Sequence, residues 1–203
     1  MKSVLMSIQP KWCELIASGK KTIEVRKTKP KLEVPFKVYI YCTQEKRLLC
    51  KFSKGERIDD EHFFEEHVFV RQNTWIRGHF NPNGKVIGEF VCNRIEKIGW
   101  FATPQDSIWI DRFNTDTCLT NKETYEYTKG KLFYEWHISK LVIYDKPREL
   151  SEFSTYTKDK CPANLNGTCL DMTQNDVTLC KNLDCQYKKL TRPPQSWCYV
   201  ESE

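Results

Sequence analysis

The sequence predicts a mainly β protein with short helices (α+β class), folded as a small β-barrel. Strand-like runs rich in Val, Ile, Tyr or Phe recur at residues 3–8, 22–27, 37–42, 85–92, 138–144 and 196–200. Few connections between them resemble βαβ crossovers, which favours a barrel over a parallel sheet. The 203 residues are 39% hydrophobic, enough to bury a core. We therefore expect a single domain over residues 1–203.

A short helix is predicted over residues 9–18. Pro10 suits the first helical position, where its missing N–H costs nothing, and Gly19 suits the left-handed position that ends a helix. Trp12 and Ile16 share one face of this helix, together with Leu15, and we expect that face to point into the core.

A second helix is predicted from about Asn121 to Lys129. Thr120 precedes it and Glu123 follows three residues later, which is the spacing of a capping box. Residues 54–84 carry many charges and end in a turn sequence, so we interpret them as an insertion with limited structure of its own.

The turn after the first helix is the most informative segment. In residues 22–27 the pattern alternates, so Glu24 and Arg26 lie on one face of a strand, beside Lys21. One interpretation is that this turn binds anions or nucleobases. The alternative is a solvated strand face with an ion pair that contributes well under ~1 kcal/mol.

Positive charge is concentrated at this end of the chain. Residues 1–60 hold 14 Lys/Arg and 7 Asp/Glu, a net charge of +7, whereas the rest holds 18 and 20, a net charge of −2. Six of these cations fall within 12 residues and suit a phosphate backbone, although Lys-rich loops also keep proteins soluble. These cations are Lys20, Lys21, Arg26, Lys27, Lys29 and Lys31.

Residues 7–12, Ile16 and residues 19–27 resemble the N-terminal signature of ASCH domains, S-I-x-P followed by a helix and G-x-K-x-x-E-x-R. Residues 85–92, 136–145 and 192–201 resemble longer bacterial and phage ASCH proteins more weakly. The resemblance implies a PUA-like small β-barrel. It also implies a pocket that is formed by the helix, turn and strand and faces RNA or a nucleotide-like ligand.

The favoured function is an RNA- or nucleotide-binding module. Lys21 and Arg26 would hold phosphate or carbonyl oxygens, and Glu24 would accept from a base edge or fix Arg26. Trp12, Trp136 and Trp197 are candidates for stacking on a base, or else core residues. The candidate ligand-binding residues are Ser7, Lys11, Trp12, Lys21, Glu24, Arg26, Gln195 and Trp197.

The alternative function is catalytic. One ASCH branch is a small amidohydrolase acting on N4-acetylcytidine, and some ASCH proteins are ribonucleases. Lys21 matches the catalytic lysine of that branch, but Glu24 stands where the branch has its threonine, although Thr22 is near. Lys21 and Glu24 are the catalytic candidates if the chain is an enzyme, with Lys21 accessible to solvent. Glu89 matches the distant glutamate only loosely, and we interpret His137 as structural.

Cysteines cluster at the C-terminal end, over residues 159–198. Five of the ten cysteines lie in the last 43 residues, and the segment is poor in apolar side chains, so we expect a structural zinc to hold it together. Free thiols, or a redox or disulfide role, are the alternatives, because the spacing C-x7-C-x10-C-x4-C is looser than paired C-x2-C motifs. Cys198 is a doubtful fifth ligand, since strand alternation could bury it. The predicted zinc ligands are Cys161, Cys169, Cys180 and Cys185.

The N-terminal residues lead into a strand rather than into the apolar run of a secretory signal. No stretch is apolar enough to span a membrane. We therefore expect a cytoplasmic protein without a membrane partner, and the sequence identifies no protein partner.

Overall fold

The computed structural model describes residues 2–45, 48–52, 68–72, 83–99, 113–156 and 187–201. Within these ranges strands dominate, accompanied by two short α-helices. The predicted class, mainly β with short helices, is confirmed.

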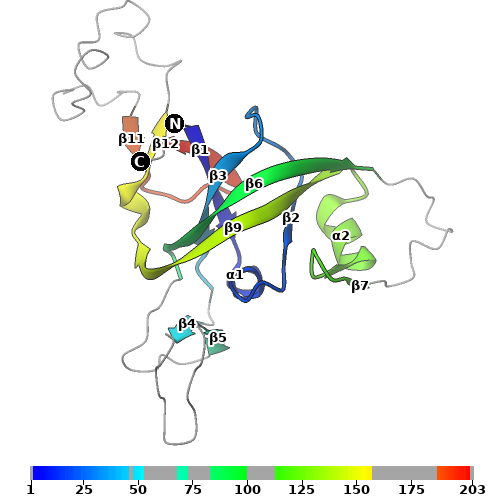
Figure 1. Cartoon of the computed structure of the whole chain (residues 1–203), viewed down its shortest axis with the longest axis horizontal. Coiled ribbons are helices and arrows are strands. Elements are labelled where there is room, and N and C mark those ends of the chain that lie inside the picture. The colour runs from blue at the N-terminus through cyan, green and yellow to red at the C-terminus, as the bar shows by residue number, and fades with distance from the viewer. Residues whose placement is uncertain are drawn as a thin grey trace, which may run out of the picture.

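Six strands form the central sheet, in the order β12-β1-β3-β6-β9-β2. β1 and β3 pair in parallel, and the other neighbours pair antiparallel. Each of the six predicted strand runs overlaps one of these strands. Two strands, β6 and β9, are much longer than predicted and run side by side across the molecule (Figure 1). The strands span β1 Lys2–Ile8, β2 Ile23–Arg26, β3 Phe36–Cys42, β6 Val86–Ile98, β9 Phe133–Arg148 and β12 Trp197–Glu201.

The prediction of a small β-barrel is wrong, because the six-stranded sheet is open. Strands β12 and β2 lie at its two ends and share no backbone ladder. Side chains join these ends instead: Trp197 Nε1 donates to Thr28 Oγ1 at 3.0 Å, and Arg26 Nη1 donates to Ser196 Oγ at 3.4 Å. Strand β2 has only four residues, and its backbone pairs with β9. The contacts between the β2 and β12 ends of the sheet are therefore made by side chains.

Both faces of the central strands are buried, as strand alternation requires. Val4 and Met6 in β1 belong to one core cluster, and Leu5 between them belongs to another on the opposite face. Trp136 is fully buried in the first cluster. The prediction that Trp136 could stack on a ligand is therefore wrong, and its alternative as a core residue is confirmed.

Helix α1 (Pro10–Ala17) covers the first cluster with Cys13 and Ile16. Its predicted ends are confirmed: Pro10 starts the helix, and Gly19 follows it with a left-handed φ of 72°. Trp12 and Leu15 are only half-buried, so of the predicted core face only Ile16 is fully buried.

Helix α2 (Asn121–Thr128) begins with the predicted capping box. Glu123 N donates to Thr120 Oγ1 at 3.1 Å, and Thr120 N donates to Glu123 Oε2 at 2.9 Å. Within the described part of the chain, no helix is long and apolar enough to cross a bilayer.

Short elements that the sequence did not reveal complete the described fold. Three two-stranded pairs lie outside the central sheet, β4 with β5, β7 with β8 and β10 with β11. Much of the predicted insertion, 54–84, lies outside the described residues, but β5 falls within it. These elements span β4 Leu48–Phe52, β5 Val68–Gln72, β7 Phe113–Asn114, β8 Leu119–Thr120, β10 Ser154–Tyr156, β11 Tyr187–Lys189 and the 3-10 helix η2 Leu150–Glu152.

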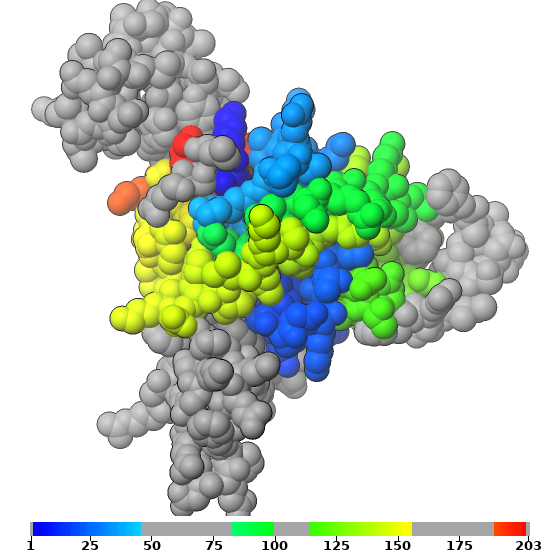
Figure 2. All heavy atoms as spheres, in the orientation of Figure 1, coloured from blue at the N-terminus to red at the C-terminus, as the bar shows by residue number. Residues whose placement is uncertain are grey.

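The β7–β8 turn and α2 lie against the N-terminal segment. Thr22 N and Ile23 N both donate to Asp116 O, at 2.9 and 3.0 Å. In Figure 2 the blue atoms of the N-terminal segment lie next to green atoms of this later segment. Residues about 90 positions apart thereby form one side of the molecule.

Candidate functional site

A cavity of about 610 Å³ opens between these two segments. Its volume falls within the range of roughly 300–1,000 Å³ that is typical of small-molecule sites. The end of β1, helix α1, strand β2, helix α2 and the residues before β12 all contribute to it. Its lining includes Ser7, Trp12, Lys21, Glu24, Arg26, Leu119, Tyr127 and Gln195.

Three charged side chains at this cavity are buried. Lys21, Glu24 and Arg26 are 2%, 6% and 7% exposed. The predicted placement of Glu24 and Arg26 on one strand face is confirmed, but the interpretation of that face as solvated is wrong. The expectation that Lys21 is accessible is also wrong. The β7–β8 turn and α2 cover this face, and no local sequence pattern encodes that cover.

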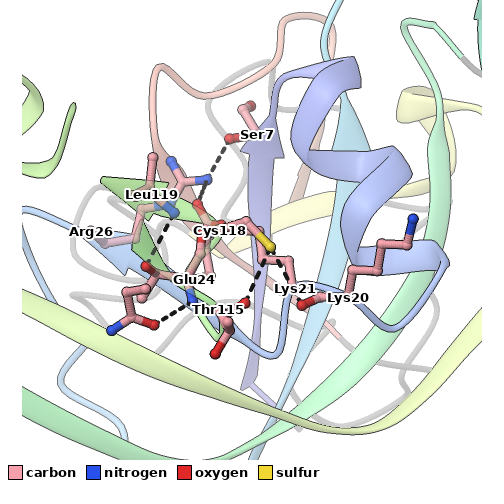
Figure 3. Close-up of polar contacts among 10 residues, drawn as sticks. Ser7, Lys20, Lys21, Glu24, Arg26, Thr115, Cys118 and Leu119 are labelled. Atoms are coloured by element: carbon pink, nitrogen blue, oxygen red, sulfur yellow. Dashed lines mark hydrogen bonds and ion pairs between the residues drawn. The ribbon is translucent and has the colours of Figure 1, made fainter. Parts of the chain in front are cut away.

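The three charges form one connected cluster (Figure 3). Arg26 Nη2 lies 3.0 Å from Glu24 Oε1 and donates to the Ser7 carbonyl at 2.7 Å. Lys21 Nζ lies 3.4 Å from Glu24 Oε2 and donates to the Thr117 carbonyl at 2.5 Å. Two cations thus share one carboxylate, which leaves the cluster with a formal charge of +1.

Two buried atoms of the cluster have no hydrogen-bond partner among the described residues. These are Glu24 Oε2 and Arg26 Nε. The contact between Lys21 and Glu24 Oε2 is an ion pair without hydrogen-bond geometry. A buried polar group without a hydrogen bond costs about 1–3 kcal/mol, and charged groups cost more. Both atoms belong to residues that line the cavity.

Other predicted ligand-binding residues also line the cavity. Ser7 Oγ donates to the Pro194 carbonyl at 2.6 Å, which holds the segment before β12 against β1. Gln195 in that segment lines the cavity, as does Trp12 of α1. The ring centroid of Trp12 lies 5.1 Å from Lys21 Nζ.

Two predicted residues lie elsewhere. Lys11 lines a neighbouring cavity rather than this one, and its Nζ lies 4.3 Å from the centroid of the Trp12 ring. Trp197 does not line this cavity. Its ring packs against Trp136, with centroids 6.0 Å apart, and its Nε1 bonds to Thr28. Alternation alone could not tell that this side chain faces the core.

Sequence analysis missed Tyr127 on α2. This residue lines the cavity, is 39% exposed, and has Lys27 Nζ 4.7 Å from its ring centroid. Burial of its hydroxyl raises the pKa of Tyr127. The capping box predicted the helix, but which of its faces meets the cavity depends on how α2 docks.

Glu89, the loosely matched glutamate, and His137, interpreted as structural, both have partners outside this cavity. Glu89 lies 2.8 Å from Lys37 Nζ and accepts from the Tyr144 hydroxyl at 2.6 Å. Burial alone would raise the pKa of Glu89, but these two hydrogen bonds lower it. His137 pairs with Ile23 across β9 and β2, and burial, followed by the charge of Arg94, lowers its pKa.

The predicted zinc ligands Cys161, Cys169, Cys180 and Cys185 lie outside the described residues. Within the described ranges, no three His, Cys, Asp or Glu side chains are grouped to hold a metal. Cys198 is half-buried in β12 and packs against the second core cluster. Burial raises its pKa to about 11, so this thiol is protonated at neutral pH.

Comparisons with known proteins agree with this architecture. The ASCH domain family model matches residues 6–145. The chain belongs to the ASCH family. This ASCH domain also resembles crystal structures of the ASCH protein from Zymomonas mobilis. A tyrosine-to-phenylalanine mutant of that protein matches with a TM-score of 0.50 at 15% identity, over 99% of this chain and 91% of that one.

A second structure of the Zymomonas mobilis protein matches with a TM-score of 0.49 at 15% identity, over 98% of this chain and 87% of that one. At this identity the likeness concerns the fold alone, and that fold is the PUA-like β fold of the family. No curated protein sequence matches the ASCH chain significantly.

Proposed function

We propose that this ASCH domain binds single-stranded RNA and encloses one base in the cavity. The observation that carries this proposal is the buried Lys21–Glu24–Arg26 cluster, in which Glu24 Oε2 and Arg26 Nε have no hydrogen bond within the described residues. PUA-like folds of this family are often linked to RNA binding, which agrees with the proposal.

These two atoms without a hydrogen bond complement the edge of a nucleobase. Bases present hydrogen-bond donors beside acceptors on their Watson–Crick edges, and single-stranded RNA leaves those edges free. Glu24 Oε2 would accept from an amino or imino group, and Arg26 Nε would donate to a carbonyl or ring nitrogen. Such a ligand removes the desolvation cost of both atoms, whereas an apolar ligand leaves it in place.

Aromatic rings are placed to cover the base. Trp12 and Tyr127 come from different helices and both line the cavity. Stacking of a base on an aromatic ring contributes about 1–3 kcal/mol in single-stranded recognition. Tyr127 is the more exposed of the two residues, so its ring is accessible to an entering base.

The exposed cations after β2 suit the phosphates of the same strand. Lys27 lies over Tyr127, and Lys29 Nζ lies 6.0 Å from the ring centroid of Tyr134. The loop that carries them is tied to β12 where Lys31 N donates to the Tyr199 hydroxyl at 2.7 Å. These lysines are therefore presented on an anchored loop, which lowers the entropy cost of ordering it on binding.

The experiment is fluorescence anisotropy of labelled single-stranded RNA at several salt concentrations. Tyr127→Ala should weaken binding by about tenfold or more, because the base no longer stacks on the ring. Replacing Lys27, Lys29 and Lys31 with Ala should flatten the log–log salt slope by about 0.7 for each phosphate that is no longer neutralised. Lys146→Ala changes an exposed lysine that lines neither cavity and serves as the control.

Undetectable affinity at low salt would refute the proposal. So would equal effects of the Lys146 control and the Lys27, Lys29 and Lys31 substitutions. DNA of the same sequence belongs in the assay, and tighter binding of DNA would change the ligand class.

The amidohydrolase alternative requires a nucleophile beside Lys21. Thr22 is not among the cavity-lining residues, and its Oγ1 donates to Asp116 Oδ1 at 3.1 Å. We therefore expect no acetyl release from N4-acetylcytidine in a chromatographic assay. Turnover that is lost in Lys21→Arg, a variant that keeps the charge, would show that the chain is an enzyme and not only a binding module. The same RNA, analysed after incubation, tests for ribonuclease activity.

A further inference from the structure

A second cavity, of about 630 Å³, lies beside the first. Helix α1, the turn before β2 and the segment around β8 and the start of α2 surround it. Its lining consists of Lys11, Leu15, Lys20, Thr115, Cys118, Thr120 and Glu123.

Residues adjacent in sequence line the two cavities from opposite sides. Lys11 lines the second cavity and Trp12 the first; Lys20 lines the second and Lys21 the first. Cys118 lines the second cavity and Leu119 the first. Neighbouring Cα atoms are about 3.8 Å apart, so the two cavities lie close together at these three places.

Glu123 lines both cavities, so its side chain lies between them. Its carboxylate is already compensated: Oε2 accepts from Thr120 N, and Oε1 lies 3.8 Å from Lys11 Nζ. At this point Lys11 and Glu123 therefore carry no net charge together, and Lys20 supplies the positive charge of the second cavity.

The second cavity combines an apolar surface with cations. Leu15 and the Cys118 thiol supply apolar surface, and burial raises the pKa of that thiol, which keeps it uncharged. Lys11 and Lys20 are exposed at the cavity. Cys118 adopts a left-handed φ of 53°. Its Sγ lies 3.4 Å from the Lys20 carbonyl and 3.3 Å from the Thr115 carbonyl, so this wall is fixed by local bonds.

We propose that the second cavity binds the base of the nucleotide adjacent to the one in the first cavity. The recognised unit is then a single strand of at least two nucleotides, with Lys20 contacting a phosphate of that strand. This inference rests on the proposed function of the first cavity. Charge complementarity and the closeness of the two cavities support a neighbouring nucleotide as the occupant, because Glu123 lines both cavities and three pairs of adjacent residues have one member in each lining.

The test compares nucleoside monophosphates with the matching dinucleotides UpU, CpC, ApA and GpG, by calorimetry on the full chain. The best-bound dinucleotide should bind at least about tenfold more tightly than its monophosphate, the gain of one further base contact. Thr115→Trp fills the second cavity from an exposed position. It should remove that gain while leaving monophosphate affinity within about twofold, a change well below one base contact.

Lys20→Ala should reduce the dinucleotide gain by about threefold or more, because one phosphate then lacks its cation. Lys146→Trp and Lys146→Ala are the matched controls and should retain the full gain. Melting curves identify any variant that fails to fold, and Lys20→Ala then provides the independent test.

The two proposals fail in different ways. Monophosphates that bind as tightly as every dinucleotide would overturn the second base site and leave the first intact. A gain that survives Thr115→Trp would overturn it as well. If neither monophosphates, dinucleotides nor longer RNA bind, the proposed function itself is refuted, and this inference is refuted with it.

Discussion

Glu24→Gln tests whether the buried charge cluster holds this region together. In the native protein, Glu24 is the anion that Lys21 and Arg26 share, at 3.4 and 3.0 Å. The substitution keeps the shape of the side chain and removes its charge. Two cations then remain beside each other, both less than a tenth exposed, with no anion between them.

The expected cost follows from this geometry. Removing one partner of a buried ion pair destabilises a protein by about 3–5 kcal/mol, so Glu24→Gln should lower the free energy of unfolding by that amount. Lys21→Met leaves a neutral Arg26–Glu24 pair and removes mainly the charged hydrogen bond to the Thr117 carbonyl, which is worth about 1.5–3 kcal/mol. Glu24→Gln should therefore be less stable than Lys21→Met.

The double variant sharpens the comparison. In the Glu24→Gln background, Lys21→Met removes repulsion between two buried cations. The double variant should thus be destabilised by less than the sum of the two single costs, with a coupling of about 0.5–3 kcal/mol, the range for residues in one charge network.

Urea unfolding monitored by circular dichroism measures these differences, with constant slopes checking that the denatured state is unchanged. Lys20→Met alters the exposed neighbouring lysine and should stay within about 0.5 kcal/mol of the native protein. The reasoning is refuted if Glu24→Gln costs under about 1 kcal/mol, the value of an exposed pair, or if Lys21→Met proves the more damaging change.

Three further outcomes are expected. Thr120→Ala removes the capping-box acceptor at the start of α2 and should cost about 0.5–2 kcal/mol in urea unfolding; an unchanged midpoint would contradict it. In the pair on β3 and β6, the pKa of Lys37 is raised by its hydrogen bond to Glu89, whose own pKa is lowered by that bond despite burial. Glu89 contributes to folding stability above its ordinary pKa of 4.5, and this contribution is lost as the pH falls through the lowered pKa. Lys37 contributes to folding stability below its ordinary pKa of 10.5, and this contribution is lost as the pH rises through the raised pKa. Glu89→Gln should therefore reduce the loss of unfolding free energy between neutral and acid pH by about 0.2–1 kcal/mol, since the pair is partly exposed. A loss identical to that of the native protein would rule this out. Elemental analysis should find about one zinc per chain, and chelation should unfold the C-terminal part first, because binding at such a site is largely folding energy; a metal-free protein with unchanged melting would remove the zinc hypothesis. Its proposed ligands are Cys161, Cys169, Cys180 and Cys185.

The sequence by itself determined the local features of this protein. Helix α1 starts at Pro10 and stops before Gly19, because one residue lacks an N–H and the other tolerates a positive φ. The capping box at Thr120 follows from the spacing of two polar side chains. Alternation placed Glu24 and Arg26 on one face of β2. Each of these features depends on residues within a few positions of one another.

Only the tertiary structure decided what surrounds that face. Asp116 and Thr117, about 95 residues away, bond to Thr22, Ile23 and Lys21 and cover the charges. Tyr127 lines the cavity and Trp197 does not, and the reason is the same for both: whether a side chain is exposed depends on long-range packing. Strand periodicity states which residues share a face, but a buried cluster of charges forms only where a distant segment removes the water.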